Sequence, residues 1–208
     1  MNPTITNFWN HFQNNQMIFS QITYFDPVTF APHFQEITNL LHQYNPNLEL
    51  IFRAKNKYRL IVTANRKSKH FASARELVKH APQLDNWKII ALVPRKKNLN
   101  KFYDEKDGNF LYGTVKFRIS QCYFSLIGLK FSHKIGLEVH LPNYNDCPNT
   151  IRLHEAVSIA VEHLIGERLF SKHIKFIKIG QLNDDQEEVL QLHELYDFIA
   201  SLKREKLL

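Results

Sequence analysis

The chain is poor in cysteine and glycine, and each shortage excludes a class of protein. Two cysteines in 208 residues cannot form a disulfide framework, and a chain of this length does not need one. Six scattered glycines leave no G-x-G-x-x-G motif, no Walker loop and no G-x-S-x-G elbow. We therefore expect no glycine-rich phosphate cradle, and we assign no catalytic residue.

The N-terminal quarter lacks basic residues, because no lysine or arginine precedes Arg53. It also has no clean apolar run, so it does not resemble a secretory signal. No stretch of the chain approaches the roughly 18–20 consecutive apolar residues of a membrane span. We expect a cytoplasmic protein with no membrane partner.

Metal-binding motifs are missing although the chain has eleven histidines. There is no HExxH and no close Cys/His cluster of the kind that binds zinc. One helix, expected to begin at Ile151, carries the densest group: His154, Glu155, Glu162, His163 and Glu167. We interpret these residues as the solvated face of that helix, and we expect neither a metal nor a cofactor.

The two cysteines have different sequence surroundings. Cys147 lies between Asp146 and a proline, near His140 and His154, but a reactive cysteine needs a base, a cation or a helix N-terminus that lowers its pKa. A lone loop cysteine is usually incidental. Cys122 lies within strand material and is expected to be a small core residue. An enzyme with an unrecognised site remains an alternative.

Positive charge is concentrated in the middle of the chain. Residues 1–52 carry a net charge of −3, residues 53–101 carry +12 and residues 102–208 carry −2, giving +7 in total. A phosphate-binding footprint results if the basic residues of the middle segment converge on one face. A solvated surface with scattered charges is the alternative. The candidate nucleic-acid-binding residues are Lys55, Lys57, Arg59, Arg66, Lys67, Lys69, Arg95, Lys96, Lys97 and Lys101.

A helix and a strand between Lys69 and Arg95 organise the expected fold. Apolar residues recur at helical spacing from Phe71 to Ala81, with Ser68 as the expected N-cap, and Pro82 ends the helix. Residues 87–93 then form a strand that is apolar on both faces. Such a strand is normally central in its sheet.

The whole pattern predicts a single α+β domain with a mostly antiparallel sheet and helices packed on it. We expect N-terminal helices over 1–46, with a break at Asn14-Asn15, and a C-terminal helix over 184–206. The order hairpin, helix, strand occurs twice, which suggests a pseudo-duplicated ββαβ arrangement. The expected segments between the terminal helices are a first ββαβ unit over 47–95, a surface loop over 96–110 and a second strand-rich unit over 111–181.

Several short motifs resemble those of an uncharacterised family of bacterial cytosolic α+β proteins with no established activity. They are Phe8-Trp9-Asn10-His11-Phe12, Leu60-Ile61-Val62-Thr63-Ala64-Asn65, Ala81-Pro82-Gln83-Leu84-Asp85-Asn86-Trp87, Ile90-Ala91-Leu92-Val93-Pro94-Arg95 and Leu164-Ile165-Gly166-Glu167. The chain departs from the family pattern at Asn65-Arg66, where a glycine is expected, and at Asn86, where proline or glycine is common. The resemblance implies a compact bacterial protein and supplies no catalytic residue.

The sequence favours a non-catalytic binding module that recognises a protein partner. The alternative is a nucleic-acid-binding protein that uses the basic segment 53–101. The oligomeric state stays open.

Overall fold

The chain folds into two compact units, where the sequence led us to expect a single domain. The computed structural model describes residues 2–21, 27–54, 57–127, 134–142, 144, 151–182 and 189–204. The units are Met1–Val93 and Pro94–Leu208. Each buries a hydrophobic cluster drawn only from its own residues. The boundary coincides with Pro94, which cannot donate a hydrogen bond to a strand ladder.

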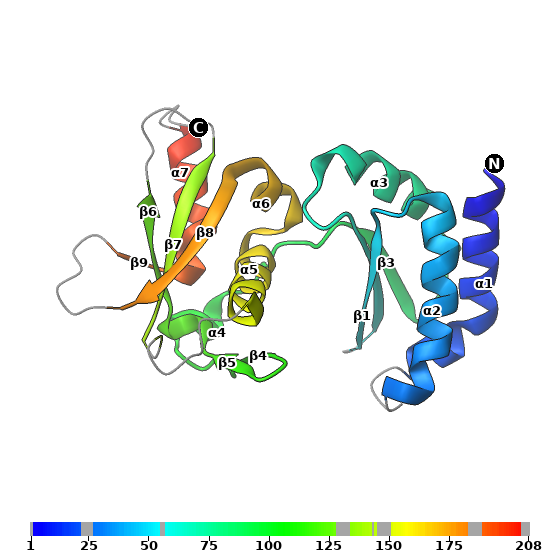
Figure 1. Cartoon of the computed structure of the whole chain (residues 1–208), viewed down its shortest axis with the longest axis horizontal. Coiled ribbons are helices and arrows are strands. Elements are labelled where there is room, and N and C mark those ends of the chain that lie inside the picture. The colour runs from blue at the N-terminus through cyan, green and yellow to red at the C-terminus, as the bar shows by residue number, and fades with distance from the viewer. Residues whose placement is uncertain are drawn as a thin grey trace. The chain divides into compact units, whose positions relative to one another are not determined.

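The first unit contains three α-helices and a three-stranded sheet of order β1-β2-β3. β1 pairs with β2 antiparallel, and β2 pairs with β3 parallel. Figure 1 shows α1 and α2 side by side next to the sheet. The elements are α1 (Pro3–Ser20), α2 (Pro27–Tyr44), β1 (Glu49–Ala54), β2 (Tyr58–Thr63), a 3-10 turn (Ser68–His70), α3 (Phe71–Lys79) and β3 (Trp87–Ala91).

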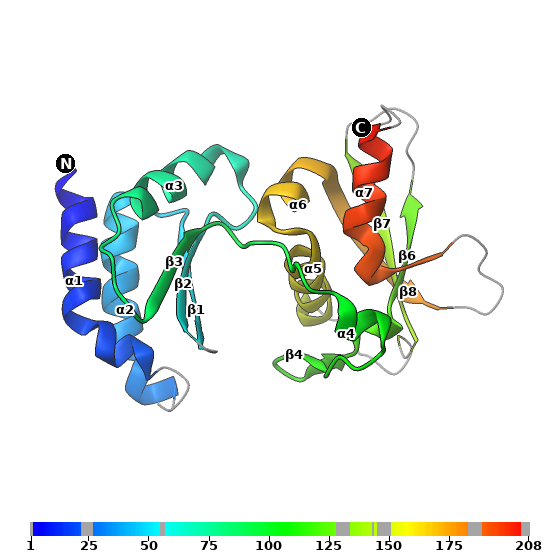
Figure 2. The same ribbon diagram turned by 180° about the vertical axis from the view of Figure 1, so that it is seen from behind.

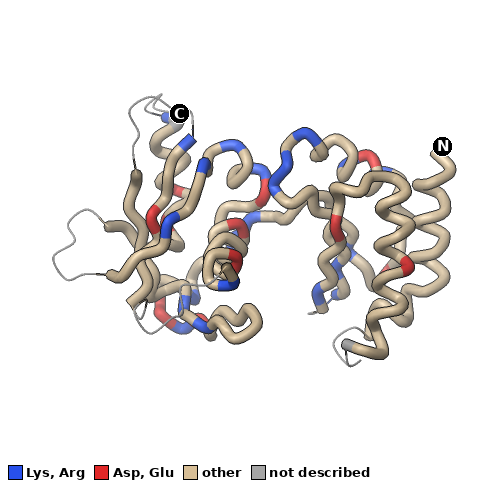
Figure 3. Tube along the Cα trace, viewed as in Figure 1, with Lys and Arg blue, Asp and Glu red and all other residues tan. Residues whose placement is uncertain are grey.

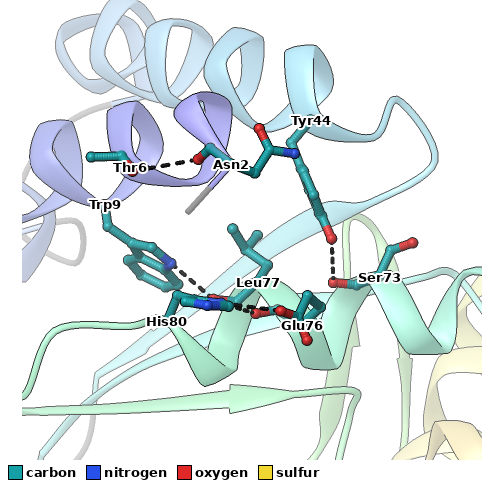
Figure 4. Close-up of polar contacts among 8 residues, drawn as sticks. All are labelled: Asn2, Thr6, Trp9, Tyr44, Ser73, Glu76, Leu77 and His80. Atoms are coloured by element: carbon teal, nitrogen blue, oxygen red, sulfur yellow. Dashed lines mark hydrogen bonds and ion pairs between the residues drawn. The ribbon is translucent and has the colours of Figure 1, made fainter.

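Aromatic side chains join the helices of the first unit to one face of its sheet. The Phe12 ring of α1 lies 4.9 Å from the Trp87 ring of β3, and Phe19 lies 5.2 Å from Phe52 of β1. Two polar contacts fix α3 to the other helices (Figure 4). Trp9 Nε1 donates to Leu77 O at 2.9 Å, and the Tyr44 hydroxyl donates to the Ser73 carbonyl oxygen at 3.1 Å.

Helix α1 continues past the break that we expected at Asn14-Asn15. The Asn15 side chain donates to the carbonyl oxygen of His11 at 2.9 Å, so the amide adds to the helix hydrogen bonds of this turn. Beyond it, Phe19 is fully buried and stacks on Phe12 with ring centroids 5.5 Å apart. Burial of a large aromatic ring outweighs the poor helix propensity of asparagine.

Two details around α3 also differ from the expectation. Ser68 begins the 3-10 turn, and the N-cap position of α3 is taken by His70, which makes no side-chain cap hydrogen bond. β3 is an edge strand, because β2 lies between it and β1. Asn65 and Arg66 have φ angles of 49° and 65°, which is the backbone region where glycine is the usual residue.

The second unit contains a four-stranded sheet of order β8-β7-β6-β9 and a separate hairpin of β4 and β5. β6 pairs antiparallel with β7, and β7 pairs parallel with β8 (Figure 2). The elements are α4 (Asn100–Tyr103), β4 (Phe110–Tyr112), β5 (Val115–Phe117), a 3-10 turn (Ile119–Gln121), β6 (Tyr123–Ile127), β7 (Ile135–Leu141), α5 (Ile151–Ile165), α6 (Glu167–His173), β8 (Ile174–Gln181), β9 (Leu190–Gln191), a 3-10 turn (Leu192–Glu194) and α7 (Leu195–Arg204).

The twofold ββαβ arrangement is confirmed at the level of strand order. In the first unit an antiparallel hairpin, β1-β2, is followed by α3 and by β3, which pairs parallel with β2. The second unit repeats this order with β6-β7, the helices α5 and α6, and β8 parallel to β7. β3 and β8 therefore occupy equivalent positions.

Two expected segments of the second unit need correction. Residues 96–110 are more than a surface loop, because they include α4 and place Phe102 in the core at 3% exposure. The C-terminal helix begins at Leu195, after β9 and a 3-10 turn, and a capping box between Gln191 and Glu194 precedes it. The expected start at residue 184 lies outside the described residues.

None of the helices in the described part of the chain combines the length and the apolar character needed to cross a bilayer.

Candidate nucleic-acid interface

The sheet of the first unit has one face that carries no helix of that unit among the described residues. Side chains alternate along a strand, so Leu50, Leu60 and Trp87 share the face on which α1, α2 and α3 pack. The residues between them form the opposite face. We call this second set the helix-free face: Glu49, Ile51, Arg53, Arg59, Ile61, Thr63, Lys88 and Ile90.

Three cations stand directly beside one another on the helix-free face. Arg53 of β1 is the register partner of Arg59 of β2, and Arg59 is the partner of Lys88 of β3. We call these three residues the basic row. Arg59 and Lys88 are exposed and Arg53 is half-buried. Figure 3 shows basic positions in blue on the strands of this unit.

The pairing of Arg59 with Lys88 in the basic row is unfavourable for folding. Like charges that lie directly opposite in a sheet repel each other, and such a pair costs about 0.2–1 kcal/mol relative to neutral residues. Arg59 and Lys88 form no ion pair with any residue in the described part of the chain that would offset this repulsion. An anionic ligand would remove the repulsion.

A row of isoleucines runs parallel to the basic row, two residues further along the strands. Ile51, Ile61 and Ile90 are register partners across the three strands. Ile61 of the central strand is buried, and its two neighbours are half-buried. The helix-free face therefore combines a charged row with an apolar row.

The first unit holds six of the ten basic residues that the sequence nominated. Arg59 belongs to the basic row, and Lys57 directly precedes β2 near the same end of that strand. Arg66, Lys67 and Lys69 follow the carboxyl end of β2, at the opposite end of the strand from Arg59. Lys55 lies outside the described residues.

The other four nominated residues belong to the second unit. The guanidinium of Arg95 lies 3.7 Å from the ring centroid of Tyr196, and Lys96 Nζ lies 4.5 Å from that of Phe102. Such cation–π contacts hold these side chains against their own unit. Lys97 and Lys101 are exposed in the same segment. The nominated residues that the structure describes thus lie in three places: at the start of β2, after the end of β2, and in the second unit.

Arg53 and Lys88 are binding candidates that sequence reasoning missed. Arg53 was counted in the basic segment, yet only the strand register places it beside Arg59. Lys88 follows Trp87, and its neighbourhood depends on how β3 pairs with β2. The one signal in the sequence was the alternation of Arg53 and Arg59 with apolar residues in the two arms of an expected hairpin.

A small pocket of about 440 Å³ lies at the amino ends of β2 and β3. Lys57, the segment 81–85, Trp87 and Ile89 line it. Lys57 Nζ donates to the backbone oxygen of Asp85 at 3.3 Å across the pocket. The lining supplies one ammonium and one carboxylate but neither a histidine nor a cysteine, so it offers no nucleophile with an adjacent base.

The polar residues of α5 do not form a single solvated face. His154 and Glu155 are exposed, whereas Glu162 is 7% exposed and Glu167, at the start of α6, is fully buried. The Tyr112 hydroxyl donates to a Glu155 carboxylate oxygen at 3.0 Å. No group of three His, Cys, Asp or Glu side chains within the described ranges is placed to hold a metal ion.

Cys122 is a buried core residue, as the sequence predicted. Its side chain is fully enclosed, and its thiol donates to the carbonyl oxygen of Arg118 at 3.1 Å. Burial raises the pKa of this thiol far above its usual value, and the nearby charge of Asp107 raises it further. A thiol that stays protonated is a poor nucleophile. Cys147 lies outside the described residues.

Comparison of the chain with protein-family models, with curated protein sequences and with solved structures finds no match. The resemblance to a bacterial family stays a prediction.

Proposed function

We propose that this protein binds nucleic acid through the sugar–phosphate backbone, and that the basic row of the first unit is the contact site. The observation that supports the proposal is the cross-strand alignment of Arg53, Arg59 and Lys88. Arginine offers a planar fork that matches a phosphate, and lysine offers a compact charge. The first unit also has ten lysines and arginines against five acidic residues, which favours a polyanion.

The test is the affinity of the full-length protein for a fluorescently labelled oligonucleotide, measured by anisotropy at several salt concentrations. The informative variant is the double substitution Arg59→Ala and Lys88→Ala, which removes two exposed charges from the row. For a duplex, the slope of log K against log salt should fall by about 0.9 for each phosphate that the protein no longer neutralises. The double variant should therefore reduce the slope by about 1.8.

A control variant separates the basic row from net charge. Arg75→Ala with Lys79→Ala removes the same two charges from the exposed surface of α3. This variant should bind like the parent. Equal reductions in affinity for the two double variants would show that only total charge matters, and no binding by the parent at low salt would refute the proposal.

The protein partner expected from the sequence stays a prediction. A pull-down with and without nuclease treatment distinguishes it, because a direct protein partner is retained after nuclease and a nucleic-acid-bridged one disappears.

A further inference from the structure

We infer that the ligand of the basic row is a double-stranded nucleic acid, held by its backbone without regard to base sequence. The inference rests on the proposed function and adds the class of ligand. It depends on which other residues share the helix-free face with the three cations.

The first reason is that no residue of the helix-free face is aromatic. The chain has sixteen phenylalanines and eight tyrosines, but the residues of this face are isoleucine, threonine, glutamate and the three cations, and of these Ile61 and Thr63 are buried. Proteins that bind single strands stack the exposed bases on aromatic side chains. The helix-free face has no surface on which bases can stack.

The second reason is that the aromatic residues of the same three strands are engaged elsewhere. Phe52, Tyr58 and Trp87 point to the face on which the helices pack. Tyr58 lies 5.3 Å from Trp87, and Phe52 lies 6.2 Å from Trp87, measured between ring centroids. Phe52 and Tyr58 are half-buried and Trp87 is 9% exposed, so these rings offer little free surface on which a base could stack.

The third reason concerns the width of the sheet. Neighbouring strands lie about 4.8 Å apart, so three strands and their side chains exceed the roughly 12 Å width of a DNA major groove. That groove admits a helix or a two-stranded ribbon. Arg53, Arg59 and Lys88 therefore meet the phosphates outside the grooves, where contacts carry no base information.

The row also has a suitable length for a duplex backbone. Its outer residues, Arg53 and Lys88, are about 10 Å apart, because two strand spacings separate them. Phosphates of one duplex strand recur about every 3.4 Å along the helix axis. Three long side chains can therefore contact about three successive phosphates.

The experiment compares duplexes with single strands on the full-length protein. The probes are two labelled duplexes of about 20 base pairs with unrelated sequences, a duplex RNA of the same length, and an oligothymidylate. Neutralising about three phosphates predicts a salt slope near −2.7, which means about 40-fold weaker duplex binding at 200 mM than at 50 mM salt. Arg59→Ala should reduce that slope by about 0.9, and Arg75→Ala should leave it unchanged.

The two DNA duplexes should have affinities within about threefold of each other, and the oligothymidylate should bind at least about tenfold more weakly than either. Duplex RNA reports whether the site needs B-form geometry, and binding of either duplex type supports the inference. Oligothymidylate binding as tight as the duplexes, or a tenfold preference between the two sequences, would overturn the inference and leave the proposed function standing. Failure of all four probes would refute both.

Discussion

At the scale of single residues, Glu105, at the end of α4, is one of the described non-glycine residues with a positive φ angle. Its φ angle is 52°. The Glu105 N–H donates to Phe102 O at 3.1 Å, and the Lys106 N–H donates to Lys101 O at 2.8 Å. This pair of bonds is the Schellman arrangement, in which glycine is the favoured residue at the position that Glu105 occupies.

Replacing Glu105 by glycine should therefore stabilise the protein. The left-handed conformation costs a residue with a side chain about 1–2 kcal/mol, and the greater freedom of glycine in the unfolded chain offsets part of the gain. We expect a net increase of about 0.5–1 kcal/mol in the free energy of unfolding. Lys106→Gly is the matched control, because residue 106 lacks a positive φ and should lose stability. Thermal denaturation of the two variants measures both effects.

A second prediction at this scale concerns His193, which is fully buried. Its ring lies 4.4 Å from the Tyr103 ring and 6.0 Å from the Phe102 ring. Neither ring nitrogen has a hydrogen-bond partner within the described part of the chain. Burial lowers the pKa of His193 below its usual value, although the carboxylates of Glu194 and Asp107 oppose the shift.

The sign of the pH dependence follows from that pKa. As the pH falls through about 6.5, the unfolded chain binds a proton at His193 before the folded protein does, so stability decreases towards acid. His193→Phe keeps an aromatic ring and removes the proton site. Its stability should fall less than that of the parent between pH 7 and pH 5. Urea denaturation at each pH supplies the comparison, and identical pH profiles would contradict the assignment.

At the scale of elements, β7 depends on a glycine near its start. A Cβ atom added to Gly136 would lie 2.8 Å from the carbonyl oxygen of Ile127 and 2.5 Å from a ring carbon of Phe176. Phe176 is 40% exposed and can move, but the Ile127 oxygen belongs to the backbone of the paired strand β6. The close packing of β6, β7 and β8 therefore requires a residue without a side chain at position 136.

Gly136→Ala should destabilise the second unit by about 1–3 kcal/mol, the usual cost of overpacking. Gly108→Ala is the control, because no atom lies within 4 Å of the added carbon there. Circular dichroism during thermal unfolding distinguishes them. A Gly136→Ala variant as stable as the Gly108→Ala variant would show that β6 and β7 can separate without cost.

The sequence predicted which segments form helices and strands better than it predicted which elements lie beside one another. Periodicity indicated the two hairpins, α3 and α5, because alternation and helical spacing are local properties. It placed β3 in the middle of a sheet, yet β3 is an edge strand, and the described helices of its own unit pack on one face of that sheet. It also missed α4, since four residues carry too short a pattern, and Phe102 makes this segment core through contacts distant in sequence.

The same limit applies to the candidate site. The charge of the segment 53–101 is visible in the sequence, but the alignment of Arg53, Arg59 and Lys88 requires the register of one antiparallel and one parallel pair. A shift of one residue would turn any of these side chains to the opposite face. Composition therefore pointed to the class of ligand that we propose, and only the register selected the residues of the basic row.

At the scale of the whole molecule, the two units have separate cores and should have separable unfolding transitions. Both tryptophans, Trp9 and Trp87, lie in the first unit, so tryptophan fluorescence reports on that unit alone. Trp87→Ala should cost the first unit about 3–5 kcal/mol, because a large ring buried against Phe12 is removed. In that variant Trp9 still reports the transition, which should move to a lower temperature.

Gly136→Ala should not change the midpoint temperature of the fluorescence transition. It should lower the midpoint temperature only of the part of the circular dichroism change that comes from the second unit, because Gly136 belongs to that unit. The two variants thus form a reciprocal pair measured with two probes. If each substitution shifts the midpoint temperature equally in fluorescence and in circular dichroism, the chain unfolds as one cooperative unit. The two units divided at Pro94 would then be separate in structure but would not unfold separately.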